Sequence, residues 1–330
     1  MARYHRAMLR IGLPENVPQN LLQDFPKDSV EFVPLAEHLD RDTAVQFWIP
    51  PLHGRFARPM FPYLRGVRVV QSLLAGVDWI TPWLPKEILL CDGQGIHNLP
   101  VAEWIVGAIL ASLKRFPESR DLQHEQLWDG QIQGGRSPEQ DDADSGQAPP
   151  YRVLGDELVR KKVLIVGYGG IGAELERMLQ PFSVDILRVA RTARPGIRAI
   201  ADLAKVLPTA DVVVLLVPLT DSTRGLFNAD MLNRMKDGAL LVNAARGPVV
   251  DTDALVAQLQ AKRIHAVLDV TDPEPLAKGH PLWSAPNCFI TPHVAGSVEG
   301  FFVRAYTFAA AQVRRYLAGE PLQNQVHDGY

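Results

Sequence analysis

The feature that most constrains this chain is a glycine-spaced segment near its middle. Residues 163–172 read VLIVGYGGIG, in which a short apolar run rich in β-branched residues ends on glycine. Such a run is typical of a buried parallel strand, and residues 173–180 are expected to form a helix. Gly167, Gly169 and Gly172 have the spacing G-x-G-x-x-G. This spacing between a strand and a helix predicts a dinucleotide-binding α/β fold.

Each glycine of this loop has a physical role. Gly167 permits the tight turn, Gly169 lets the backbone approach a pyrophosphate, and Gly172 lets the helix pack closely on the strand. The free N–H groups of the helix N-terminus favour phosphate, so we expect Gly170 and Ile171 to line the same site. The alternative is a tight turn that holds no ligand.

Length, charge and cysteine content limit the number of domains and the kinds of binding partner that this protein can have. A chain of 330 residues indicates about two domains, and a net charge of −3 gives no basic field for nucleic acid or an anionic membrane. Two cysteines, Cys91 and Cys288, make neither a disulfide framework nor a zinc cluster, which favours a reducing compartment. We expect no bound metal, no signal peptide and no membrane span, and we predict a cytoplasmic protein.

The chain alternates strands with helices or turns on both sides of a polar stretch. Before this stretch we expect strands at 8–12, 30–33, 44–49, 69–73 and 88–91. A helix at 99–113, with Asn98 as its N-cap, is apolar on nearly every side, so a domain boundary or a subunit interface should bury it. Residues 129–150 are expected to form a long loop or a partly disordered segment.

The second half opens on the glycine loop. We expect strands at 163–166, 184–189, 212–217, 240–243, 264–269 and 288–290, and an amphipathic helix at 300–317. Six strands match a full dinucleotide-binding sheet. At the end of the second strand stand Arg191, Thr192 and Arg194, with no acid for a ribose 2′-hydroxyl. Arginine suits a 2′-phosphate, so we predict NADP as the preferred cofactor, with NAD possible; the alternative is a solvated basic loop.

Three later segments, 243–247, 269–276 and 291–296, follow predicted strands, where ligands bind in open α/β sheets. They offer Arg246, Glu274 and His293. Hydride transfer to a 2-oxo acid needs an anion clamp, a proton donor and a carboxylate beside that donor. Each residue alone has a structural alternative, but the ordered set downstream of a nucleotide loop favours this chemistry.

These motifs resemble the D-isomer-specific 2-hydroxyacid dehydrogenase family over most of the chain. The matching segments are the glycine loop, Asn-x-x-Arg-Gly at 243–247, Asp-Val-x-x-x-Glu-Pro-Leu at 269–276, His-Pro-Leu-Trp at 280–283 and Pro-His-x-Ala-Gly at 292–296. The resemblance implies that Arg246 binds the substrate carboxylate and carbonyl. It also implies that His293 is the acid or base, and that Glu274 hydrogen-bonds His293 and favours its protonated form.

The resemblance implies further contacts. Asp269 would meet the nicotinamide carboxamide, and the turn at Leu74, Ala75, Gly76 and Val77 would hold the substrate carboxylate through backbone N–H groups. The other expected cofactor contacts are Val217, Pro218, Ala244, His293 and Gly296.

The resemblance also implies a domain order: a Rossmann domain at 99–293 inserted into a flavodoxin-like substrate domain at 1–98 and 294–330, in a homodimer. Two departures stand out. Thr271 replaces a usually bulkier residue, so the packing behind Glu274 should differ, and the stretch after Trp128 is long and acidic. That stretch is either a disordered insertion or an arm at the dimer interface.

We therefore expect an NAD(P)H-dependent reductase of a small 2-oxo acid of the glyoxylate or hydroxypyruvate type. One alternative is a cofactor-sensing protein like the family's transcriptional corepressors. The other is a dehydrogenase of a bulkier or phosphorylated acid, with Trp79, Trp83 and Trp283 near the motifs.

Overall fold

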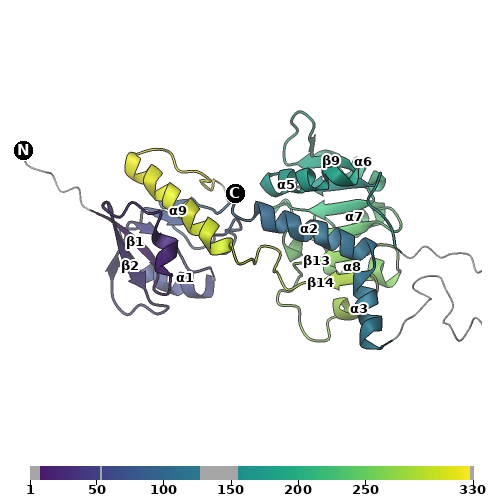
Figure 1. The fold of residues 1–330 in the computed structure, drawn as a ribbon, viewed down its shortest axis with the longest axis horizontal. Coiled ribbons are helices and arrows are strands. Elements are labelled where there is room, and N and C mark those ends of the chain that lie inside the picture. Colours follow the sequence, from purple (N-terminus) through teal and green to yellow (C-terminus); the bar gives the residue numbers. More distant parts are fainter. Residues whose placement is uncertain (1–7, 53, 127–154, 328–330) are drawn as a thin grey trace, which may run out of the picture. The chain divides into compact units, whose positions relative to one another are not determined.

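The chain divides into two compact units, one of which is discontinuous in sequence. The computed structural model describes residues 8–52, 54–126 and 155–327 (Figure 1). Unit 1 consists of Met1–Asn98 and Gly296–Tyr330, and unit 2 of Leu99–Ala295. The expected loop at 129–150 lies outside the described residues. No helix of the described ranges is long and apolar enough to span a membrane.

Unit 2 is built on a fully parallel, seven-stranded sheet. Its order, β10-β9-β8-β11-β12-β13-β14, is the dinucleotide-binding order 3-2-1-4-5-6 with a seventh strand added at one edge. The strands are β8 (Lys162–Val166), β9 (Asp185–Ala190), β10 (Arg198–Ala199), β11 (Val212–Leu215), β12 (Leu240–Asn243), β13 (His265–Leu268) and β14 (Cys288–Ile290). The expectation of six strands was wrong by one, because β10 has two residues and leaves no periodic pattern.

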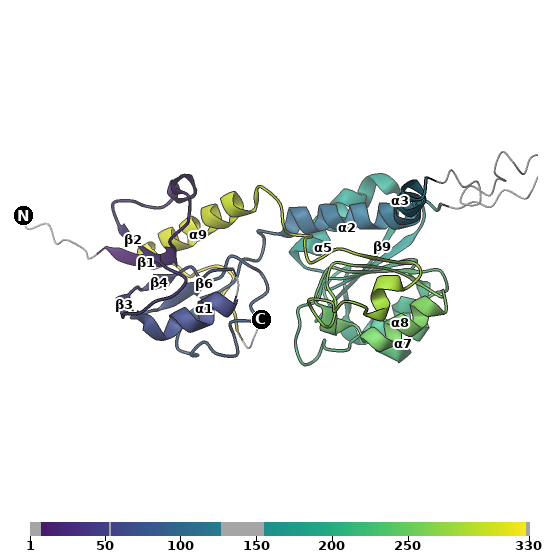
Figure 2. The ribbon, with the colours of Figure 1, turned by 90° about the horizontal axis from the view of Figure 1, so that it is seen from below.

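Helices cover both faces of this sheet (Figure 2). The helices are α2 (Asn98–Leu113), α3 (Phe116–His124), α5 (Gly170–Leu179), α6 (Leu203–Val206), α7 (Ala229–Arg234) and α8 (Thr252–Gln260). Alternate strand residues sort between the faces: Ile165 and Val214 pack with α2 and α5, whereas Leu164 and Val213 pack with α7 and α8. Because both sides are apolar, the strands read as continuous hydrophobic runs.

Unit 1 has a second parallel sheet, of order β2-β1-β4-β6-β7. In chain order this is 2-1-3-4-5, the flavodoxin-like arrangement. The strands are β1 (Leu9–Pro14), β2 (Val30–Leu35), β4 (Phe47–Trp48), β6 (Val69–Gln71) and β7 (Leu89–Cys91), and a separate pair joins β3 (Thr43–Ala44) to β5 (Leu64–Arg65). A single strand at 44–49 was wrong: Val45 N–H bonds the carbonyl of Arg65, and Gln46 N–H bonds that of Arg10, so the chain changes partners there.

Two helices enclose the sheet of unit 1, α1 (Gly54–Met60) on one face and α9 (Phe301–Ala318) on the other (Figure 2). Phe301, Ala309 and Val313 of α9 are buried in the core that includes β1 and β4. Short 3₁₀ segments complete the described elements: Gln19–Leu22, Phe61–Tyr63, Gln180–Phe182, Ile200–Asp202, Leu207–Thr209, Gly247–Val249 and Pro281–Ser284.

Candidate active site

The glycine loop joins β8 to α5 at the carboxyl edge of the unit 2 sheet. Gly167 has φ +98°, and a Cβ there would lie 2.6 Å from the backbone of Leu216 and Val217, so the turn tolerates only glycine. The helix begins at Gly170 rather than at the expected residue 173, with Gly169 as its N-cap. Glycine lowers helix propensity, which is why the sequence pattern placed the start too late.

This loop fits a pyrophosphate. A Cβ at Gly169 would meet nothing closer than the Gly167 carbonyl oxygen at 4.0 Å, so the backbone there is open to a close approach. The first turn of α5 has N–H groups without helical acceptors, and they carry the positive end of the helix dipole. Gly170, Ile171 and Gly172 all belong to this turn.

The end of β9 carries three polar side chains in an exposed turn. Arg191, Thr192 and Arg194 are all exposed. Arg194 Nη2 donates to the carbonyl of Tyr168, between the first two glycines, at 2.8 Å, and reciprocal backbone bonds to Ile197 close the turn. The arginines therefore sit on a turn that contacts the glycine loop.

The loop after β12 presents Arg246 through a set of local hydrogen bonds. The Asn243 side chain is buried, accepts from Ala245 N–H at 3.0 Å and donates to the Arg246 carbonyl at 3.2 Å. Arg246 Nη1 also donates to the Ala245 carbonyl at 2.8 Å, and the side chain is half-buried. A Cβ at Gly247 would stand 1.9 Å from the carbonyl oxygen of Thr271, so this loop touches the one after β13.

His293 and Glu274 form the pair expected from the sequence spacing. His293 Nδ1 lies 2.6 Å from Glu274 Oε1, and the two side chains are 46% and 41% exposed. His293 has φ +55°, a backbone conformation that non-glycine residues adopt rarely and that is common at functional sites. The pair is thus solvent-accessible and held at the ends of two neighbouring strands, β13 and β14.

Asp269 anchors the histidine loop. Its buried carboxylate accepts from Thr291 Oγ1 at 2.5 Å and from the N–H groups of Val294 and Ala295, each at 2.9 Å. Its carbonyl accepts from His293 N–H at 2.8 Å. These four bonds surround His293 on both sides in sequence, so they hold its unusual backbone conformation.

Sequence patterns missed Asn243 and Thr291 as anchors, although both stand inside motifs that were found. The signal available was a short polar side chain at or just after a strand end, a position that often caps a loop. Thr271, the residue where the resemblance leads us to expect a bulkier side chain, is buried, and its hydroxyl donates to the Pro273 carbonyl at 2.9 Å.

The other expected contacts stand in varied surroundings. Val217 is buried, Ala244 is half-buried and Pro218 is exposed, all near strand ends of unit 2. Gly296 belongs to unit 1, where a Cβ would come within 2.5 Å of the His97 ring.

The turn at 72–77 in unit 1 is held from within. Ser72 Oγ accepts from the N–H of Leu74, and the Trp79 indole donates to the Gly76 carbonyl at 3.1 Å. Among the described residues, the N–H groups of Ala75, Gly76 and Val77 donate no hydrogen bond to the protein. Three such N–H groups in one turn can bind an anion.

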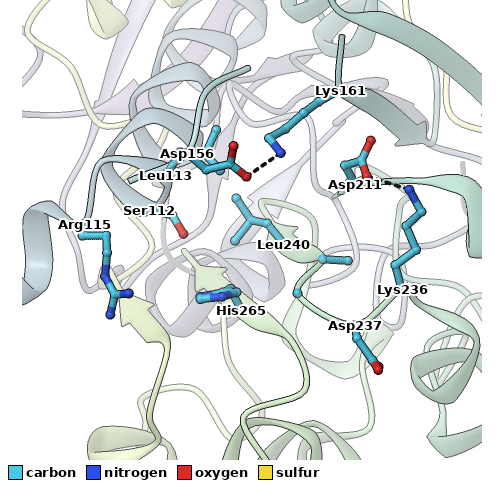
Figure 3. Close-up of a pocket in the computed structure, with 12 residues that line it drawn as sticks. Ser112, Leu113, Arg115, Asp156, Lys161, Asp211, Lys236, Asp237, Leu240 and His265 are labelled. Carbon is cyan, nitrogen blue, oxygen red and sulfur yellow. Dashed lines mark hydrogen bonds and ion pairs between the residues drawn. The ribbon is translucent and has the colours of Figure 1, made fainter. Parts of the chain in front are cut away.

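A cavity of about 310 Å³ lies at the opposite edge of the unit 2 sheet (Figure 3). Lys161, Asp211, Leu240 and His265 line it, all at the amino ends of strands. Its lysines are paired with Asp156 and Asp211 at 2.5 and 2.7 Å. It is separate from the glycine, Arg246 and His293 loops of unit 2, which follow the carboxyl ends of the strands.

Comparison with known proteins identifies the family. Residues 106–295 match the model of the D-isomer specific 2-hydroxyacid dehydrogenase NAD-binding domain.

Within the described ranges, no three His, Cys, Asp or Glu side chains could hold a metal ion.

Relatives and solved structures agree with this match. A glyoxylate reductase of Thermofilum pendens is 34% identical over 263 residues, which are 77% of this chain and 73% of the relative. An NADPH-dependent glyoxylate/hydroxypyruvate reductase of Sinorhizobium meliloti, solved with NADP and sulfate, has TM-score 0.76 and 25% identity, covering 98% of this chain and 100% of that one.

A 2-hydroxyacid dehydrogenase of Xanthobacter autotrophicus, solved with NADPH and MES, has TM-score 0.75 and 27% identity, covering 97% and 100%. These neighbours confirm the predicted architecture of a Rossmann domain with a flavodoxin-like substrate domain. The chain belongs to the D-isomer specific 2-hydroxyacid dehydrogenase family of NAD(P)-dependent oxidoreductases.

Proposed function

We propose that this protein is an NADPH-preferring reductase that converts a small 2-oxo acid, of the glyoxylate or hydroxypyruvate type, to a D-2-hydroxy acid. The observation that carries the proposal is the His293–Glu274 contact of 2.6 Å at strand ends next to the Arg246 loop, in a dinucleotide fold. Several relatives that match most of this chain are glyoxylate or glyoxylate/hydroxypyruvate reductases, and two structural neighbours were solved with NADP or NADPH.

The charged residues have separate proposed roles in proton transfer and substrate binding. A reduced nicotinamide, when bound, supplies the hydride. Glu274 accepts the Nδ1–H of His293, which leaves Nε2 to give its proton to the carbonyl oxygen as that oxygen becomes a hydroxyl. Arg246 holds the carboxylate and carbonyl oxygens, because a guanidinium matches that planar anion. In oxidation, His293 takes the proton back.

Other residues would bind the two ligands. The glycine loop would hold the pyrophosphate, and Arg191, Thr192 and Arg194 the 2′-phosphate. Asp269 has lone pairs beyond those used by the histidine loop, so we propose that it also meets the carboxamide. We propose that the N–H groups at 75–77 bind the substrate carboxylate. Val217, Pro218, Ala244 and Gly296 remain proposed cofactor contacts.

A screen of 2-oxo acids tests the activity. NADPH or NADH oxidation would be followed with glyoxylate, hydroxypyruvate, pyruvate, bulkier and phosphorylated acids. We expect the highest kcat/KM with glyoxylate or hydroxypyruvate, and with NADPH over NADH. Inactivity on every acid despite tight NADPH binding would favour a cofactor sensor, and activity on phosphorylated acids alone would replace the substrate class. Arg246→Ala should raise KM for the acid and lower kcat.

We further propose a homodimer and a cytoplasmic location. Trp104, Val106 and Leu110 on α2 are only partly buried within unit 2, and such apolar side chains suit a subunit interface. Light scattering that gives a monomer at micromolar concentration would refute the dimer. Cys91 and Cys288 are both free thiols, which fits a reducing compartment.

A further inference from the structure

Tyr168, the residue between the first two glycines of the loop, is fixed from several sides. Its hydroxyl donates to Glu176 Oε2 on α5 at 2.8 Å, and its ring lies 5.8 Å from the guanidinium carbon of Arg188 on β9. Its N–H, like that of Gly167, donates to the Val189 carbonyl at 2.9 Å. The side chain thus connects the loop to the helix that follows it and to the neighbouring strand.

Glu176, which accepts from the Tyr168 hydroxyl, also forms a bidentate ion pair with Arg188. Arg188 Nε donates to Glu176 Oε2 at 2.6 Å, and Nη2 donates to Oε1, so both carboxylate oxygens are engaged. The side chains are 19% and 29% exposed. A bidentate, mostly buried arginine–carboxylate pair fixes both orientation and distance. The hydrogen bonds from Arg188 lower the pKa of the Glu176 carboxyl, and burial raises it by less. The net pKa lies below the ordinary value, so Glu176 stays charged near neutral pH.

The backbone of Tyr168 also contacts one of the residues proposed to bind the cofactor. Arg194 Nη2 donates to the Tyr168 carbonyl at 2.8 Å. Arg194 is one of the two arginines proposed for the 2′-phosphate, whereas Arg191 makes no hydrogen bond or ion pair with the loop within the described part of the chain. The conformation of the loop and the position of Arg194 are therefore linked through one peptide unit.

We propose that Tyr168 is a positioning residue: held by Glu176 and Arg188, it fixes the pyrophosphate-binding loop and links it to Arg194 at the 2′-phosphate site. A preorganised loop binds more tightly because less conformational freedom is lost on binding. The inference rests on the proposed use of a nicotinamide dinucleotide, and it adds that part of the affinity comes from groups that do not touch the cofactor.

The test measures NADPH and NADH affinities by calorimetry, with no turnover required, in Tyr168→Phe and Glu176→Gln. Both keep the shape of the side chain. Tyr168→Phe removes the hydrogen bond of the hydroxyl to Glu176, and Glu176→Gln removes the carboxylate charge that accepts from Tyr168 and Arg188. We expect Kd for both cofactors to rise about threefold to tenfold. In turnover, KM for the cofactor should rise while kcat and KM for the 2-oxo acid stay unchanged, a split that general destabilisation would not give.

The matched control is Glu174→Gln on the same helix. Glu174 pairs with Arg177, which is 63% exposed, and in the described ranges neither residue forms a hydrogen bond or ion pair with Tyr168. The Glu174→Gln variant should bind NADPH and NADH with unchanged affinity. Unchanged affinities in Tyr168→Phe and Glu176→Gln would overturn the proposal, as would equal losses in Glu174→Gln.

A further comparison tests the link to Arg194. Arg194→Met should weaken NADH binding more than Arg191→Met does, although NADH has no 2′-phosphate, because only Arg194 holds the loop carbonyl. Equal NADH affinities in these two variants would refute the link. A wild-type protein that binds neither cofactor would instead contradict the proposed function, since the comparison among variants needs binding alone.

Discussion

The two edges of the unit 2 sheet both carry paired ionisable side chains, but the pairs are of different kinds. At the amino edge, Lys161 and Lys236 are paired with aspartates within 2.7 Å beside the cavity (Figure 3). At the carboxyl edge, the pair is an imidazole with a carboxylate, His293 with Glu274, and a buried aspartate holds the loop of His293. The amino-edge pairs join lysine to aspartate, whereas the carboxyl-edge pair contains the imidazole proposed as the proton donor.

The largest expected effect compares one histidine from each edge. His293→Gln should lower kcat by about 10² to 10⁴, because it removes the proposed proton donor. His265→Gln, at the amino edge, should leave kcat and KM unchanged. Steady-state kinetics with the best 2-oxo acid check both variants. Near-normal kcat in His293→Gln would remove the functional distinction between the edges.

A smaller loss is expected where two carboxyl-edge loops touch. Gly247→Ala would place a methyl group on the Thr271 carbonyl, so the Arg246 loop and the Glu274 loop must separate. We expect kcat/KM to fall about 10-fold to 100-fold and the melting temperature to drop. Kinetics and thermal unfolding of the same preparation measure both. Wild-type values for both would show that the loops need no close contact.

At the amino edge, Asp211→Asn should affect stability alone. Asp211 Oδ1 accepts from Lys236 at 2.7 Å, and Oδ2 accepts from the N–H of Lys162 at 2.8 Å. Weakening these bonds should cost about 1 kcal/mol of unfolding free energy. Urea unfolding gives this value, and kcat should not change. A loss of activity at full stability would assign this edge a functional role.

The smallest effect concerns pH. Burial, and then the charge of Arg115, lowers the pKa of His265 below its ordinary value of 6.5, although Glu118 opposes this. The unfolded chain therefore binds the proton first, and stability should decline as pH falls below about 6.5. His265→Gln should reduce that decline in melting temperature between pH 8 and pH 5. A parallel decline in both proteins would mean that His265 does not contribute.

The same two edges show what a sequence can predict. The glycine loop and the positions of Arg246, Glu274 and His293 after successive strands follow from local spacing, and the fold class is confirmed. The hydrogen bonds of Thr291 and Asn243 could not be predicted, because a short polar side chain has many possible partners until the loops are packed. The site roles themselves stay predictions.

Elsewhere, misjudged elements share a physical cause. The chain at 44–49 changes from one strand partner to another, and partner choice leaves no trace in the alternation of side chains. The start of α5 at Gly170 follows from tertiary position rather than propensity. The paired lysines at the amino edge are common surface residues, so nothing in their sequence marks a cavity.

Because unit 1 is discontinuous in sequence, its two segments are synthesised at different times. Phe301, Ala309 and Val313 of α9 belong to the core around β1 and β4, yet the ribosome makes them after all of unit 2. Domains fold as units during synthesis. The first strands to emerge must therefore wait with an apolar face uncovered while nearly two hundred residues of unit 2 are added. During that interval, the nascent chain exposes apolar surface, which makes an incomplete chain prone to aggregate.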